Sequence, residues 1–273
     1  MIDLRSINQA QFASAKRFWG AAISIKLVVF GLGVWAVFLP APPIYLPQIL
    51  LVLAVLSEGL QLQSDGIKSR AEALLRTLDL CYSFGRPISE TDKRDIVINI
   101  SRTVRKQFTG EQIPDSYFAS THIEGPRKAI ENLLQSAWYT RRQAGTMALI
   151  CIIVIVGLIV LSIVVLLVAL REISNPTLID QVVKIVTAWL LLIVSLSMLK
   201  LAWSYFKMYQ RCQKTEIVCE YLLHSRVTEG DALKQWYEYQ LARSASPLLP
   251  QWLWRIMGPS LDDAWRQASG RTP

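Results

Sequence analysis

Four apolar segments alternate with polar stretches along the chain. The longest runs from Ala144 to Leu170 without a charged residue, and a bilayer core needs only about 20 predominantly apolar helical residues. Three other segments reach or approach that length: Trp19–Leu39, Tyr45–Leu60 and Val182–Trp203. The pattern therefore predicts an all-α integral membrane protein with four transmembrane helices.

Short connections pair these four segments. Prolines 40, 42 and 43 break the chain between the first two segments, and "REISNPTLID" separates the last two. We therefore expect two transmembrane hairpins. A cleaved signal peptide is the alternative for the first segment, since Lys16 and Arg17 precede an apolar run. The length of that run, and the second apolar stretch after the prolines, favour a hairpin.

Basic residues flank the predicted hairpins on one side of the membrane. They precede the first and third segments and follow the second and fourth, whereas the first connection carries no Lys or Arg. The positive-inside rule then places both termini and the middle segment in the cytosol. The expected order is a cytosolic segment (1–18), hairpin 1 (19–60), a cytosolic helical region (61–143), hairpin 2 (144–203) and C-terminal helices with an aromatic tail (204–273). The net charge of +8 suits an anionic inner leaflet.

The cytosolic region before residue 143 carries clear helix boundaries. Apolar spacing continues past Leu60 as one helix, which Gly85 and Pro87 should end. Ser89 with Asp92 three residues later predicts the capped start of another helix, whose buried stripe would be Ile96, Ile100 and Val104.

The C-terminal region predicts a long helix that folds back on a second. Apolar positions of the first helix recur at loosely helical spacing: Phe206, Tyr209, Ile217, Tyr221 and Leu222. Thr228 and Asp231 should cap the second helix, which would pack against the helix leaving the second span. The tail "SPLLPQWLWRIMG" is either an interfacial membrane anchor, as its Trp residues would allow, or a strap across the cytosolic bundle.

A coupling element is predicted directly before the third span. Gly125 and Pro126 should start a helix that continues into the span. Four of its residues should lie near the membrane surface, with aromatic rings at the interface and guanidinium groups at the headgroups: Trp138, Tyr139, Arg141 and Arg142. Any movement of the cytosolic module would then reach span three through this helix.

Motifs of catalysis and metal binding are missing from the sequence. The chain has two histidines, His122 and His224, and no set of acidic or thiolate neighbours at the ligand spacing of a zinc site stands out beside them. It contains no phosphate-binding loop, dinucleotide fingerprint or nucleophile elbow. We therefore expect no enzyme activity, no metal and no cofactor. The four cysteines form no CxxC motif and suit a reducing compartment.

Two charged residues fall inside the first hairpin. Lys26 lies inside span one and Glu58 near the cytosolic end of span two, so an antiparallel hairpin brings them to similar depth. Intramembrane charges are candidates for function, and we expect the two residues to pair in the closed state of a pore or to face an oligomer axis. The alternative is that Lys26 snorkels to the headgroups. Four such spans leave no room for a pore within one subunit, so a pore requires a homo-oligomer.

Several stretches of the sequence resemble a known family. They are "AKRFW" before the first span, "RAEALLRTLDL" after the second, and "YFAS" followed by "GPRKAIENLLQSAWYTRRQ" before the third. These resemble the SMODS-associating four-transmembrane effectors, pore formers of bacterial anti-phage systems such as CBASS. The family favours an acidic residue where Gln135 stands, and a Phe pair where Trp138 and Tyr139 stand.

The resemblance implies a guarded toxin in the bacterial inner membrane. A nucleotidyltransferase encoded nearby would make a cyclic or linear oligonucleotide, and the cytosolic module would sense it and gate a homo-oligomeric pore, for example a tetramer. In most such systems the messenger opens the pore, whereas in the Hailong-type arrangement a single-stranded DNA oligomer holds it shut. The alternative is a scaffold that conducts nothing and recruits a cytosolic partner through its aromatic tail.

The oligonucleotide site would combine basic and aromatic side chains. A basic ridge is expected on the helix after Ser89, although an ordinary solvated face is the more common explanation of such a pattern. Two more cations lie at the start of the coupling helix, where the helix dipole favours phosphate. Two aromatic residues could stack a base. The expected ligand-binding residues are Arg102, Arg105, Lys106, Tyr117, Phe118, Arg127 and Lys128.

Overall fold

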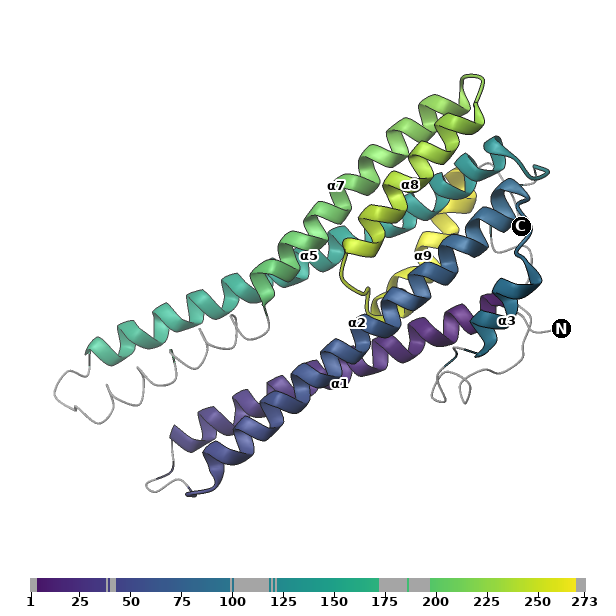
Figure 1. Cartoon of the computed structure of the whole chain (residues 1–273). Helices are drawn as coiled ribbons and strands as arrows, with labels where there is room; N and C mark the ends of the chain where they lie inside the picture. The colour runs from purple at the N-terminus through teal and green to yellow at the C-terminus, as the bar shows by residue number, and fades with distance from the viewer. Residues whose placement is uncertain are drawn as a thin grey trace. The chain divides into compact units, whose positions relative to one another are not determined.

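A computed structural model describes residues 4–37, 39, 43–98, 100, 118, 120, 122–171, 186 and 197–268 of the chain. Within these residues the secondary structure is entirely helical, without strands (Figure 1). The helices are α1 (Leu4–Val37), α2 (Leu46–Phe84), α3 (Glu90–Ile98), α5 (Pro126–Arg171), α7 (Met198–Leu223), α8 (Glu229–Ala245) and α9 (Gln251–Ala268).

Among the described residues, three helices are long and apolar enough to cross a membrane: α1, α2 and α5. The all-helical class and the presence of membrane-span-like helices are thus confirmed. Most of the fourth expected segment, Val182–Trp203, lies outside the described residues. Where it enters them, Ser197 has a φ of 49° and α7 begins only at Met198. Left-handed backbone is unfavourable for serine, so α7 does not continue through this residue.

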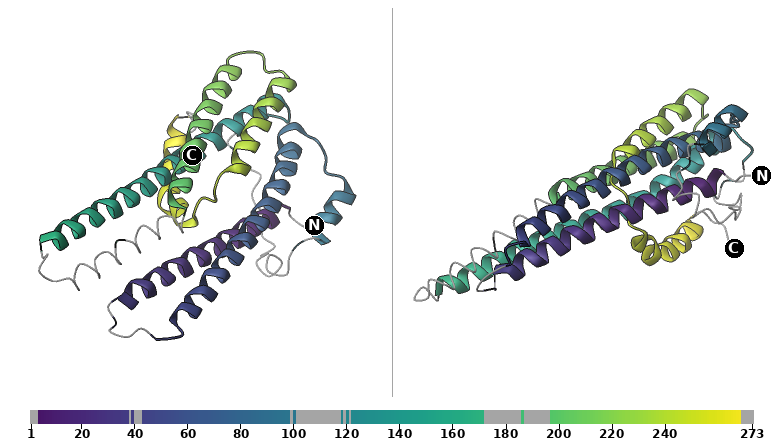
Figure 2. Two further views of the ribbon diagram at one scale, coloured as in Figure 1. Left: turned by 60° about the vertical axis from the view of Figure 1, so that its left-hand side comes forward. Right: turned by 60° about the horizontal axis from the view of Figure 1, so that its bottom comes forward.

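The chain divides into two compact units. Unit 1 contains Met1–Lys16, Asp65–Thr146 and Ser204–Pro273, and unit 2 contains Arg17–Ser64 and Met147–Trp203. Figures 1 and 2 show α1 and α2 running side by side.

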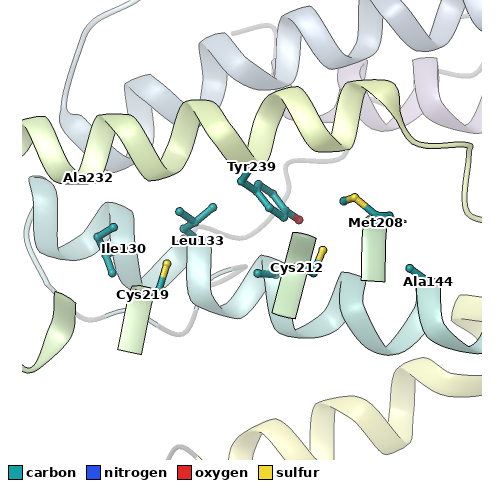
Figure 3. Close-up of a cluster of buried hydrophobic side chains, with 9 residues drawn as sticks. Ile130, Leu133, Ala144, Met208, Cys212, Cys219, Ala232 and Tyr239 are labelled. Atoms are coloured by element: carbon teal, nitrogen blue, oxygen red, sulfur yellow. The ribbon is translucent and has the colours of Figure 1, made fainter. Parts of the chain in front are cut away.

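The larger core of unit 1 joins α5, α7 and α8. Figure 3 shows Tyr239 of α8 among side chains of α5 and α7, with Ile130 and Cys219 further along the same seam. These side chains are all nearly inaccessible to solvent. Full burial of a leucine, isoleucine or methionine side chain contributes roughly 1.5–3 kcal/mol to the free energy of folding. This core is therefore a substantial source of stability for unit 1.

A second core in unit 1 involves the start of the chain. Ile7 of α1 packs with Leu74 and Leu78 of α2, and Ile96 and Ile100 cover this cluster. The sequence predicts the burial of Ile96 and Ile100, whereas Val104 lies outside the described residues. It predicts no helix before residue 18, yet α1 begins at Leu4. The buried polar residues of this first stretch hide its helical face from a search for apolar spacing.

Helix boundaries follow the sequence signals. Gly85 ends α2 with a φ of 69°, and Gly125 precedes α5 with a φ of 142°. Ser89 accepts a hydrogen bond from the Asp92 amide at 3.0 Å. Thr228 caps α8 in the same way, at 3.2 Å from the Asp231 amide. The two caps and the helix boundaries at these glycines were predicted, and the structure confirms them.

The buried face of α7 differs from the one that the sequence predicts. Of the five apolar positions named from the sequence, Phe206, Ile217 and Tyr221 are exposed. The other two, Tyr209 and Leu222, are partly buried against the core of unit 1. The helix instead buries a narrower face with two cysteines and two polar residues: Tyr205, Met208, Cys212, Thr215, Glu216 and Cys219. Side-chain size misleads here because small residues allow α7 to approach α5 and α8 closely.

Candidate functional site

Lys26 and Glu58 form an ion pair between α1 and α2. Lys26 Nζ lies 2.8 Å from Glu58 Oε1. The ammonium group also donates a 2.9 Å hydrogen bond to Gln61 Oε1, one turn further along α2. The structure thus brings together the two residues that the sequence singles out, and it adds Gln61, which sequence reasoning missed.

Small residues allow the two helices to meet around this pair. Ala22 of α1 and Ser57 and Ser64 of α2 are buried, and the Ser57 hydroxyl donates to the Ala54 carbonyl at 2.7 Å, which satisfies it within the helix. Such side chains let helices approach closely in lipid. Polar residues recur at positions 57, 61 and 64 of an otherwise apolar helix. This spacing could have predicted which face of α2 meets α1.

The two charges of the pair differ sharply in exposure. The Lys26 side chain is 10% exposed and that of Glu58 63% exposed. An open crevice of about 450 Å³ lies beside them, lined by apolar and small residues such as Val29, Val55 and Gly59. An ion pair in a low-dielectric medium is costly to break, because one charge is then left without compensation. The arrangement can therefore act as a clasp between α1 and α2.

The predicted oligonucleotide site is only partly described. Arg102, Arg105, Lys106 and Tyr117 lie outside the described residues, and Phe118 is half-buried. Arg127 is exposed and Lys128 half-buried at the start of α5. Arg127 Nε lies 3.8 Å from Glu131 Oε1, and His122 Nε2 lies 3.1 Å from the same oxygen. This carboxylate, which sequence reasoning overlooked, would compete with a phosphate for both groups.

The coupling residues contact α9 within unit 1. The Tyr139 hydroxyl donates to Asp262 Oδ1 at 2.7 Å. The Trp138 ring lies 5.4 Å from that of Trp265, and the Tyr139 ring 5.8 Å from that of Trp254. Leu253 and Leu261 of α9 are buried. These contacts make α9 a strap over α5, which was one of the two alternatives for the tail.

Arg141 and Arg142 have different surroundings. Arg141 Nη1 lies 3.1 Å from Glu216 Oε2 of α7, and both side chains are largely buried. The Arg142 guanidinium lies 5.1 Å from the Trp138 ring and its residue is exposed. Arg141 thus pairs with an acid inside unit 1, where the sequence suggested contact with lipid headgroups.

Unit 1 also buries acidic groups that the sequence did not single out. Glu72 of α2 is 3.5 Å from Arg243 of α8, and Gln240 donates to Asp79 Oδ2 at 2.7 Å. Burial raises the pKa of Asp79 to about 6, although Arg243 opposes the shift. Burial likewise raises the pKa of Glu216 to about 7, against the opposing charge of Arg141. A buried carboxylate is hard to predict because acids at these spacings usually face solvent.

The described part of the chain contains no cluster of three or more His, Cys, Asp or Glu side chains placed to hold a metal ion. Comparison with family models, with curated proteins and with solved structures gave no match for this chain.

Proposed function

We propose that the chain is one subunit of an oligomeric channel in the bacterial inner membrane that serves anti-phage defence. In this proposal four spans form two hairpins, both termini are cytosolic, and the channel depolarises the membrane. An oligonucleotide made by a partner nucleotidyltransferase acts on unit 1 and gates the channel. The observation that carries the proposal is the ion pair of Lys26 and Glu58 between two apolar helices.

The ion pair supports a gating role because α1 and α2 do not need charged residues in order to pack against each other. Two apolar helices can pack in lipid through small residues alone, and each charge within a span is costly. A pair whose partners separate when α1 and α2 move would have two discrete arrangements. Such an element can be biased by a ligand that prefers one arrangement over the other.

The helix that connects unit 1 to unit 2 supports the same proposal. α5 is continuous from Pro126 to Arg171, and its residues up to Thr146 belong to unit 1 while those from Met147 belong to unit 2. Tyr139, Thr140 and Arg141 on this helix hydrogen-bond or pair with α9, α8 and α7 respectively. A ligand that rearranges those helices would therefore act on α5.

A scaffold receives less support from the contacts of the tail. Recruitment through the aromatic tail would depend on Trp252, which is 46% exposed, because Trp254 and Trp265 lie against Tyr139 and Trp138. The scaffold also offers no reason for a charged pair between α1 and α2.

The test measures membrane potential with a dye in cells that express the protein alone, with an active nucleotidyltransferase partner, or with an inactive one. The variants are Lys26→Met, Glu58→Gln and the double substitution. Each single change leaves one charge uncompensated, so each should alter depolarisation, and the double variant should lie closer to wild type than the singles predict. The matched control removes the exposed pair of Glu90 and Lys93, whose atoms are 2.7 Å apart.

The outcomes also give the sign of the signal. Depolarisation by the protein alone that an active partner relieves indicates a pore held shut by the product. Depolarisation only with the active partner indicates a pore opened by it. If no condition changes the potential while fractionation shows the protein in the membrane, the channel proposal is wrong and the scaffold replaces it.

The ligand site has a separate test. Arg102→Glu with Arg105→Glu should abolish binding of a fluorescent single-stranded DNA oligomer or cyclic oligonucleotide to the purified protein in nanodiscs. Lys207→Glu with Lys214→Glu, on exposed positions of α7, controls for net charge. Intact binding after the first pair of substitutions would remove the basic ridge from the site.

A further inference from the structure

We propose that the exposed face of α2 around Glu58 is the contact surface for the start of α7 in a second copy of this chain, with Glu58 pairing with Lys200 of that copy. The proposal rests on the oligomer that the proposed function requires, and it names the faces by which the subunits meet. Both faces belong to unit 2.

The first observation is the incomplete shielding of Glu58. Lys26 approaches only one of its carboxylate oxygens, Oε1, and 63% of the side chain stays exposed. The neighbouring α2 residues Val55 and Leu62 are 65% and 73% exposed. An exposed carboxylate on such an apolar surface is costly in lipid, so a covering group that brings a positive charge would stabilise it.

The second observation is an exposed cation on α7. Lys200 is exposed, and it forms no ion pair with any residue that the structure describes. It lies in the first turn of α7, where backbone N–H groups without helical partners carry partial positive charge. Ser197, with its φ of 49°, separates this turn from the preceding chain. The start of α7 is therefore a positive site that suits a carboxylate.

The depths of the two charges agree. Glu58 stands two residues before Leu60, where span two is expected to end, and Lys200 stands three residues before Trp203, where span four is expected to end. A difference of one residue corresponds to about 1.5 Å along a helix. Two copies in the same membrane would thus present opposite charges at nearly the same level.

The shapes of the two faces also agree. A Cβ atom built on Gly59 of α2 would meet nothing within 4 Å, and the crevice of about 450 Å³ beside Glu58 is open. On α7, Leu199 is 65% exposed next to Lys200. Leu199 could enter the crevice while Lys200 reaches the carboxylate, because glycines let the second helix come close.

The geometry of this contact predicts a ring. The two faces differ, so the contact is heterologous and each subunit can use one face on each neighbour. Heterologous contacts close into rings when the rotation between subunits allows it. A ring is the arrangement that a channel needs, whereas a contact of identical faces would end at a dimer.

Cysteine crosslinking tests the contact directly. Copies with Gly59→Cys and copies with Leu199→Cys, carrying different tags, are expressed together, and membranes are oxidised before gel analysis. We expect a mixed dimer in this pair and none when Leu199→Cys is combined with Ile153→Cys, an exposed position of α5. The native cysteines provide the baseline, since wild type should stay uncrosslinked. Absence of the mixed dimer would overturn the proposal, whether lipid or another protein covers the face.

Charge variants test the pairing without cysteines. Lys200→Glu should convert the oligomer of the full chain in nanodiscs to smaller species, as measured by mass photometry, and addition of Glu58→Gln should partly restore it. Lys214→Glu, on an exposed position of α7 outside unit 2, should change nothing. A Lys200→Glu oligomer of unchanged size would contradict the pairing. Crosslinking without ion flux would support the contact and contradict the channel proposal. Ion flux without crosslinking would support the channel and contradict this contact.

Discussion

Tyr139 of the coupling helix donates a hydrogen bond to the Asp262 carboxylate of α9 across 2.7 Å. Asp262 is only half-buried, but the same two helices also meet through the rings of Trp138 and Trp265. The bond joins the segment that leads into the third span to the last helix of the chain. The stability of this junction is open to direct measurement.

Tyr139→Phe should lower the stability of unit 1 by about 1–2 kcal/mol, because it leaves the Asp262 carboxylate without this donor and keeps the ring in place. The midpoint of thermal unfolding, followed by tryptophan fluorescence in detergent, reports the change. Tyr237→Phe is the matched control, since Tyr237 of α8 is 51% exposed. Equal midpoints for wild type and Tyr139→Phe would show that the bond contributes nothing.

Trp265→Ala should destabilise the protein more than Trp252→Ala. Trp265 is half-buried and its ring lies within 6.1 Å of the rings of both Trp138 and Tyr139, whereas Trp252 is 46% exposed. Removing a well-packed tryptophan side chain costs about 3–5 kcal/mol, and the half-exposed site should give roughly half of that. Proteolysis of α9 in membranes measures the same difference. If Trp252→Ala made α9 as sensitive to protease as Trp265→Ala does, the contacts of Trp265 would not be what holds α9 on α5.

Two glycines should respond in opposite directions to alanine. Gly85 has a φ of 69°, and an added Cβ would meet the Glu124 carboxylate. Gly85→Ala should therefore destabilise the protein by about 1–2 kcal/mol. Gly230 lies in the first turn of α8 with nothing nearer than 3.9 Å to the added Cβ, so Gly230→Ala should stabilise by about 0.5–1 kcal/mol. Unfolding midpoints that shift in the same direction would contradict the assignment of Gly85.

Local signals explain why much of the fold could be predicted. A left-handed glycine, an N-terminal proline or a capping hydroxyl acts within a few residues, so Gly85, Pro126 and Thr228 mark helix ends without knowledge of the rest of the chain. Long uncharged runs are equally local, which is why the apolar lengths of α1, α2 and α5 were foreseen.

Tertiary packing decides what the sequence left open. The face that α7 buries depends on which neighbours fit, and they accept Cys212 and Cys219 while Phe206 and Tyr221 face outward. Glu216 is buried and Asp79 is half-buried, and each has a polar partner from another helix, Arg141 and Gln240 respectively. The ion pair of Lys26 and Glu58 was predictable from their depth in the membrane alone. Two antiparallel helices joined by a short connection bring residues of similar depth side by side.

The buried acid of α7 gives the junction a dependence on pH. Glu216 is nearly inaccessible to solvent and its Oε1 atom has no hydrogen-bond partner among the described residues. Burial raises the pKa of its carboxyl to about 7, Arg141 and Arg142 oppose the shift, and Glu220 adds to it. Because the folded protein holds the proton more tightly than the unfolded chain, this group contributes stability below its ordinary pKa of 4.5. That contribution is lost as the pH rises through about 7.

Glu216→Gln should therefore flatten the dependence of stability on pH between about 4.5 and 7. The amide oxygen of glutamine can still accept from Arg141, but the amide cannot lose a proton. The difference in unfolding free energy between wild type and variant should therefore change by roughly 3 kcal/mol across this window. Unfolding midpoints at a series of pH values measure it. Glu220→Gln, on an exposed position one turn away, should leave most of the wild-type slope. If Glu216→Gln and wild type instead follow parallel curves, the carboxylate stays ionised throughout, and Arg141 outweighs its burial.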